Sequence, residues 1–133
     1  TYMNKETLQK EFTEFKEQIA ELKEKLVKTG EEFLVKNFKE VFKKYPELEE
    51  VRWTAYTPYF NDGETCEYGS SHTSPDLLVT GCSYNGKEYK VIEKEIKEFL
   101  IQFDDELMYD LFGDHIEIIV TKEGISVNEY EHD

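Results

Sequence analysis

The sequence predicts a single α+β domain in which an N-terminal helical hairpin packs on a small, mainly antiparallel sheet. Three observations lead to this fold class. Apolar residues recur at helical spacing through residues 1–46, alternate from Val51 onward, and return to helical spacing between 92 and 113, before a final hairpin. A chain of 133 residues is also long enough to bury a core without metals or disulfides.

The first predicted helix carries an apolar seam on one face. Its members follow one another at spacings of three and four residues: Leu8, Phe12, Phe15, Ile19, Leu22 and Leu26. Gly30 is expected to end this helix, and a second helix then runs to Pro46. We expect the two helices to fold back over the sheet. Dimerisation through the first helix is the alternative.

The period changes to two at Val51, which predicts a strand. Trp53 lies on one face of this strand, and Arg52 and Tyr56 lie on the other. Pro58 indicates an edge strand or the strand's end, and residues 61–63 (Asn-Asp-Gly) are typical of a turn. Residues 77–80 and 89–91 are predicted to form short strands.

A third helical region is predicted to begin at Ile92. Asp104 is placed to cap a further short helix that Gly113 closes. The chain is then expected to end in a β-hairpin, so its regions are the helical hairpin (1–46), a strand and turn region (47–91), a helical region (92–113) and the terminal hairpin (114–133).

The charge distribution limits the classes of partner. The net charge is −14, and residues 104–133 contribute −9 of it, with ten acidic residues against one lysine. Such a surface repels phosphate backbones and anionic membranes, so direct nucleic-acid and membrane binding are not expected. No apolar run is long enough for a membrane span and no signal peptide is recognised, which favours a cytoplasmic protein. Cys66 and Cys82 fit a reducing compartment, although a bridge between them stays open.

The terminal hairpin suggests a metal site under one register. If Glu123 and Gly124 form a two-residue turn, His115 lies opposite His132, close enough for both to bind one metal ion. A turn over residues 122–124 with a glycine bulge would slip the register by one and separate the two histidines. The first register gathers the aliphatic residues better, so we prefer it.

Residues 51–68 combine aromatic rings with polar groups. One interpretation is that the rings only cover the strand beneath the helices. The other is a binding surface, because aromatic plates beside hydrogen-bonding groups suit a ring-bearing ligand or a protein partner. Its candidate residues are Arg52, Trp53, Tyr56, Tyr59, Asn61 and Asp62. We favour an Arg52 that neutralises a buried carboxylate over one that binds a phosphate.

Recognised catalytic motifs are absent from the sequence. Cys66, His72 and Asp62 supply the residue types of a nucleophilic site but no known spacing. We therefore expect neither an enzyme of this type nor a cofactor.

Two segments carry a resemblance to a known group. Residues 52–63 (RWTAYTPYFNDG) with Cys66, and the end of the chain from Phe112-Gly113-Asp114-His115 to Glu129-Tyr130-Glu131-His132-Asp133, resemble small uncharacterised proteins of bacteriophages and bacteria. The resemblance covers roughly residues 36–133. It implies an intracellular, phage-encoded protein, and suggests that the aromatic segment and the histidine-containing end form one site.

Four functional hypotheses follow from these features. The first is a non-catalytic phage accessory protein that inhibits a host defence or nucleic-acid-handling protein with a basic surface, using acidic side chains that imitate phosphates. Those side chains are Asp104, Asp105, Glu106, Asp110 and Glu117. The second is a protein that sequesters a nucleotide-type signal around Trp53, and the third is a metal-dependent enzyme that uses His115 and His132. The fourth is a structural or assembly protein whose first helix pairs with a partner.

Overall fold

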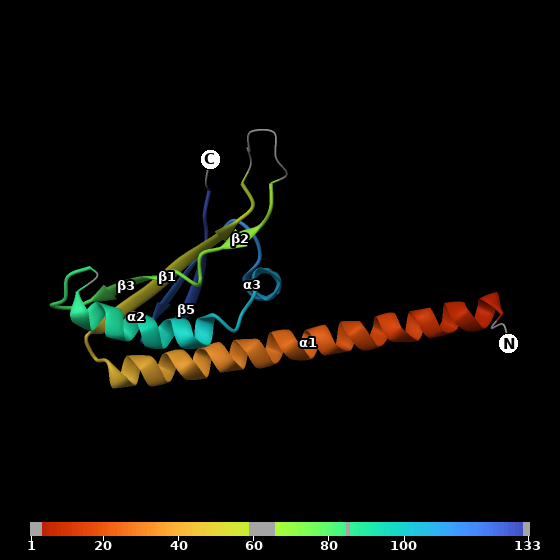
Figure 1. Ribbon diagram of the computed structural model, residues 1–133, viewed down its shortest axis with the longest axis horizontal. Helices are drawn as coiled ribbons and strands as arrows, with labels where there is room; N and C mark the ends of the chain where they lie inside the picture. Colours follow the sequence, from red (N-terminus) through yellow and green to blue (C-terminus); the bar gives the residue numbers. More distant parts are fainter. Residues whose placement is uncertain (1–3, 59–65, 85, 132–133) are drawn as a thin grey trace.

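The computed structural model describes residues 4–58, 66–84 and 86–131 and has the predicted α+β fold (Figure 1). Its elements, in chain order, are α1 (Lys5–Lys44), β1 (Leu48–Tyr56), β2 (Gly69–Ser70), β3 (Asp76–Val79), α2 (Lys87–Leu100), α3 (Asp105–Phe112), β4 (Ile116–Thr121) and β5 (Gly124–Glu129). No helix in these ranges combines the length and hydrophobicity needed to cross a bilayer.

The sheet is antiparallel throughout, and β1 is its central strand. β4 pairs with one edge of β1, while β2 and β3 pair with successive parts of the other edge; β5 follows β4. Alternation along β1 buries Val51, Trp53 and Ala55 and leaves Arg52 and Tyr56 on the other face, as the sequence predicted. β1, which carries Trp53, pairs with β4 of the terminal hairpin from Val51 to Ala55.

The core lies between one face of the sheet and the helices α1 and α2. From α1 it takes Phe38, whose ring packs at 6.1 Å from Trp53 and at 5.0 Å from Phe99 of α2. The ring of Phe112, at the end of α3, meets Trp53 from another side at 6.4 Å. Trp53 is therefore a core residue, only 2% exposed.

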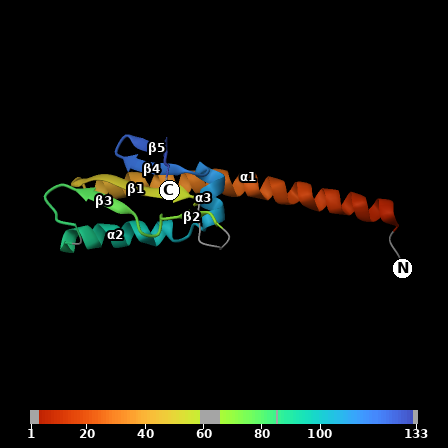
Figure 2. The ribbon, with the colours of Figure 1, turned by 90° about the horizontal axis from the view of Figure 1, so that it is seen from above.

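The predicted helical hairpin is wrong, because α1 is one unbroken helix of 40 residues. Gly30 lies inside it and has a packing role. A Cβ atom built on Gly30 would lie 3.3 Å from the ring of Phe103, so the missing side chain lets the segment between α2 and α3 approach α1 closely. Because α1 does not fold back, its first half projects beyond the sheet (Figures 1 and 2).

Two smaller predictions also need correction. Residues 89–91 are not a strand but part of the first turns of α2, in which Tyr89 is buried and its hydroxyl oxygen accepts from the Leu77 amide at 3.1 Å. α3 does begin after its predicted cap: the Asp104 carboxylate accepts from the Leu107 amide at 2.8 Å, and Gly113 follows the last turn.

The terminal hairpin adopts neither predicted register, and its turn lies one residue earlier than in the preferred one. Thr121 pairs with Gly124, so Lys122 and Glu123 form the turn. The preferred register is therefore wrong by two residues, which keeps every side chain on its predicted face: Ile118 and Val127 still point toward the core side.

Candidate functional site

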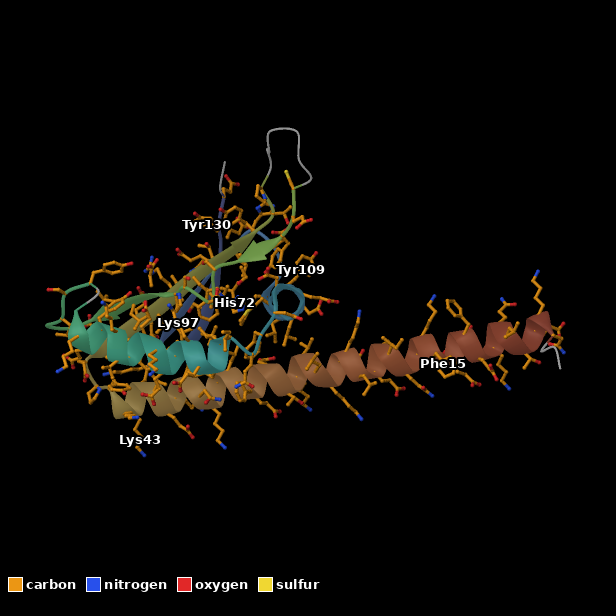
Figure 3. The ribbon with its side chains drawn as sticks, viewed as in Figure 1. Phe15, Lys43, His72, Lys97, Tyr109 and Tyr130 are labelled. Carbon is orange, nitrogen blue, oxygen red and sulfur yellow. The ribbon has the colours of Figure 1, made fainter. Side chains whose placement is uncertain are left out.

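The first half of α1 has almost no tertiary contacts. We call residues 5–28 the arm, and the remaining described residues the body. Every residue from Phe12 to Leu26 is exposed. The one ion pair that the structure gives between arm and body joins Lys23 to Glu106 at 3.8 Å, with both side chains largely in solvent. Phe15, labelled in Figure 3, lies far out on the arm.

The seam predicted from the sequence is present on the arm and is uncovered. Its six residues are between 52% and 64% exposed: Leu8, Phe12, Phe15, Ile19, Leu22 and Leu26. Scattered apolar residues are normal on protein surfaces, but a continuous stripe of six marks an interaction surface. The arm is therefore the part of the described chain that most clearly lacks its packing partner.

The arm is polar on its other faces, as a solvent-facing helix should be. Asn4 caps its first turn by accepting from the Thr7 amide at 2.8 Å. Glutamates precede lysines by four residues at Glu6–Lys10 and Glu21–Lys25, which favours a helix by a few tenths of a kcal/mol per pair. Such terms leave an isolated helix marginal, because most helix stability in proteins comes from packing an amphipathic face.

The candidate ligand site around Trp53 is not gathered into one pocket. Trp53 is in the core, whereas Tyr56 lies on the opposite face of the sheet with its ring 5.8 Å from that of Tyr130. Tyr59, Asn61 and Asp62 lie outside the described residues. The cover interpretation therefore holds for Trp53, and on the other face of the sheet the aromatic strand meets the terminal segment at the Tyr56–Tyr130 ring contact.

Arg52 pairs with carboxylates on the open face of the sheet. Its guanidinium contacts Glu50 at 2.7 Å and Glu117 at 3.7 Å, and both acidic side chains are about three-quarters buried. The hydrogen bonds that Arg52 donates to the Glu50 carboxylate are the main reason that the pKa of Arg52 is raised. This arrangement matches the favoured role of neutralising a carboxylate.

The five acidic residues of the inhibitor hypothesis divide between two places. Four lie on α3 or its cap: Asp104, Asp105, Glu106 and Asp110. Asp104 caps α3, and Asp105 accepts from the Ser70 amide at 3.3 Å. The fifth, Glu117, lies beside Arg52 on the sheet. They form no single array.

The histidine pairing has no support in the structure. His115 lies opposite Tyr130, whose amide donates to the His115 carbonyl at 2.8 Å, and His132 lies outside the described residues. Within residues 4–58, 66–84 and 86–131, no cluster of three or more metal-ligating side chains occurs. The register error explains the difference, because the observed turn displaces the partner of His115 by two residues.

His72 has a structural role that sequence reasoning missed. It is 2% exposed, and its ring nitrogens bond to the Ser70 hydroxyl at 2.8 Å and to the Phe103 carbonyl at 2.7 Å. Cys66 and Cys82 are free thiols, which answers the question of a bridge between them. The Ser-rich setting of His72 indicated a loop but gave no signal of its burial.

A groove of about 790 Å³ lies between α1 and the β4–β5 hairpin. Its walls include Val35 and Lys39 from α1 and Ile125 and Val127 from β5. Val35 lies outside the main apolar stripe of α1, and an apolar residue at such a position was the only feature of the sequence that indicated a groove on this side of the helix.

Comparisons of the chain with protein-family models, with curated proteins and with solved structures give no match.

Proposed function

We propose that this protein is a non-catalytic assembly protein that self-associates through the arm. The observation that carries the proposal is the uncovered seam, which runs from Leu8 to Leu26 along an arm of regular helix. A helix of this kind gains stability only by packing its apolar face, and a second arm offers a matching face of the same length.

The size of the surface supports a second copy as the partner. With roughly 200 Å² for a fully exposed large apolar residue, the six seam residues leave about 700 Å² open on each arm. Two arms together then offer about 1,400 Å², which lies in the lower part of the range of stable protein interfaces, about 1,200–2,000 Å², before the stems of flanking lysines and glutamates are added.

A charge substitution in the seam tests this proposal. Phe15→Asp removes an apolar side chain and adds a carboxylate at the centre of the seam, in both copies. Burying one Phe contributes about 1.5–3 kcal/mol, so the dimer should lose at least about 3 kcal/mol, a hundredfold or more in Kd. Sedimentation velocity over a range of micromolar concentrations measures this change.

The matched control is Ala20→Asp, which makes the same charge change at an exposed position of the arm outside the seam. Because Ala→Asp costs more helix propensity than Phe→Asp, any general weakening of the helix should be larger in the control. Equal loss of association in both variants would show that the seam is not the interface. A native chain that stays monomeric throughout would overturn the proposal.

The other functional hypotheses remain predictions. The inhibitor hypothesis, with its basic host partner, depends on five acidic residues, of which four lie on α3 or its cap and Glu117 lies on the sheet. The ligand hypothesis depends in part on residues 59–65, outside the described structure. Neither has an observation comparable to the uncovered seam.

A further inference from the structure

We infer that the two arms pair antiparallel, in one register, so that the two bodies stand at opposite ends of a helical rod. This inference rests on the proposed function and specifies how the second copy binds. It follows from what covers the same face of α1 within the body.

The face that carries the seam continues into the body, where α2 covers it. At 3.6 residues per turn, Phe33 lies two turns beyond Leu26 and Lys44 lies five turns beyond it, so all three share one face. Phe33 packs against Phe103, just after α2, at 5.9 Å. Lys44 pairs with Glu95 of α2 at 3.0 Å. α2 therefore occupies, beside the body half of α1, the place that stays open beside the arm (Figure 1).

A parallel partner cannot use the whole seam without a collision. Since α1 is unbroken to Lys44, a parallel second copy would continue past the seam and run through the space that α2 and Phe103 fill. An antiparallel copy avoids this, because its α1 begins, rather than continues, at the body end of the seam. It would also run in the same direction as α2, which is antiparallel to α1 (Figure 1).

The seam fixes the register of an antiparallel pair. The three-four spacing makes the seam residues alternate between heptad positions d and a, and in an antiparallel pair each d position faces an a position of the other helix. Leu8 of one copy then meets Leu26 of the other, Phe12 meets Leu22, and Phe15 meets Ile19. Symmetry repeats these contacts, so all six seam residues of both arms are covered. A shift of one heptad toward the body would push the partner's first turns into Phe103, and a shift away would leave Leu22 and Leu26 uncovered.

Flanking charges are compatible with this register but do not select it. Glu11 of each copy would lie beside Lys25 of the other, which gives two attractive pairs. Lys16 would lie beside Lys16 of the other copy, which gives one repulsive pair. Long lysine side chains can turn their ammonium groups into solvent. The orientation is therefore determined by the position of α2, and the register by the seam.

Spin labels on the outer face of the arm test the orientation without altering the seam. The labelled positions are Lys10, Glu17 and Glu24, each changed singly to Cys. The background chain carries Ser in place of Cys66 and Cys82. The readout is the distance between the two labels of a dimer, measured by electron–electron dipolar coupling. In the antiparallel register the two labels at 17 lie at the same height. Those at 10 or at 24 are 14 residues apart along the rod, about 21 Å.

The expected result is a short distance at position 17 and clearly longer distances at 10 and 24. Equal distances at all three positions, in a sample that sediments as a dimer, would overturn the antiparallel arrangement and leave the proposed function standing. A shortest distance at 10 or 24 would overturn the register. No coupling at any position, together with a monomeric mass, would overturn the proposed function as well.

Discussion

Asp114 joins the end of β1 to the turn before β4, and its removal should destabilise the body. One carboxylate oxygen accepts from the amides of Thr57 and His115, each at 2.8 Å, and the other accepts from the Thr57 hydroxyl at 2.7 Å. Hydrogen bonds to a charged group contribute about 1.5–3 kcal/mol each in isolation but are not additive within one group. With the Asp114 side chain 28% exposed, we expect Asp114→Ala to lower the free energy of unfolding by about 2–3 kcal/mol.

The same carboxylate gives this effect a defined pH dependence. Burial alone would raise the pKa of Asp114, but the hydrogen bonds from Thr57 and His115 outweigh it, so the pKa is lowered in the folded protein. An unfolded Asp has a pKa of about 3.9. The stabilisation is therefore fully present above about pH 4 and is lost as the pH falls through the folded pKa of Asp114.

Urea unfolding, followed by far-UV circular dichroism at one fixed protein concentration, measures both effects. The control is Asp105→Ala, which removes a carboxylate that accepts a single, longer bond from Ser70. We expect the gap between the native protein and Asp114→Ala to be constant near neutral pH and to narrow in acid. A gap no larger than that of the control, or one that does not change with pH, would refute the reasoning.

Three further predictions concern packing and hydrogen-bond contacts within the body, at Gly30, His72 and Tyr45. Gly30→Leu should lower the free energy of unfolding by about 1–3 kcal/mol, because the new side chain meets the ring of Phe103, although Leu gains about 1 kcal/mol in helix propensity; an unchanged or higher urea midpoint would contradict this. His72→Phe should cost about 1–3 kcal/mol by leaving the buried Phe103 carbonyl without its donor, and a native-like urea midpoint would argue against that role. Tyr45→Phe should raise the pKa of Glu95, since the Tyr45 hydroxyl is the main cause of its lowered value; an unmoved Glu95 titration by NMR would count against the contact.

The periodic parts of the sequence predicted the fold class and the apolar seam, although the first helix was expected to fold back over the sheet. Alternation from Val51 identified the buried face of β1, and the three-four spacing identified the seam. Both patterns depend only on residues close together in the sequence, and in both segments the observed secondary structure follows the pattern. The sequence left open whether the first helix folds back or projects, since the seam pattern is the same in either case.

Two of the wrong predictions fall at glycines, because glycine is compatible with more than one structural role. Gly30 was expected to end a helix, but glycine also permits close helix contact, and only the position of Phe103 distinguishes these roles. The hairpin turn was misplaced by one residue on each strand, because Gly124 closes the strand pair instead of occupying the turn. That shift removed the His115–His132 pairing while leaving the apolar face intact.

The most direct test of the account is the mass of the intact native chain in solution, measured by sedimentation equilibrium at several micromolar concentrations. Self-association through the arm predicts a mass that approaches twice the 15.8 kDa of one chain as concentration rises, and that returns to a single chain in Phe15→Asp. A mass of one chain at every concentration would contradict the central claim.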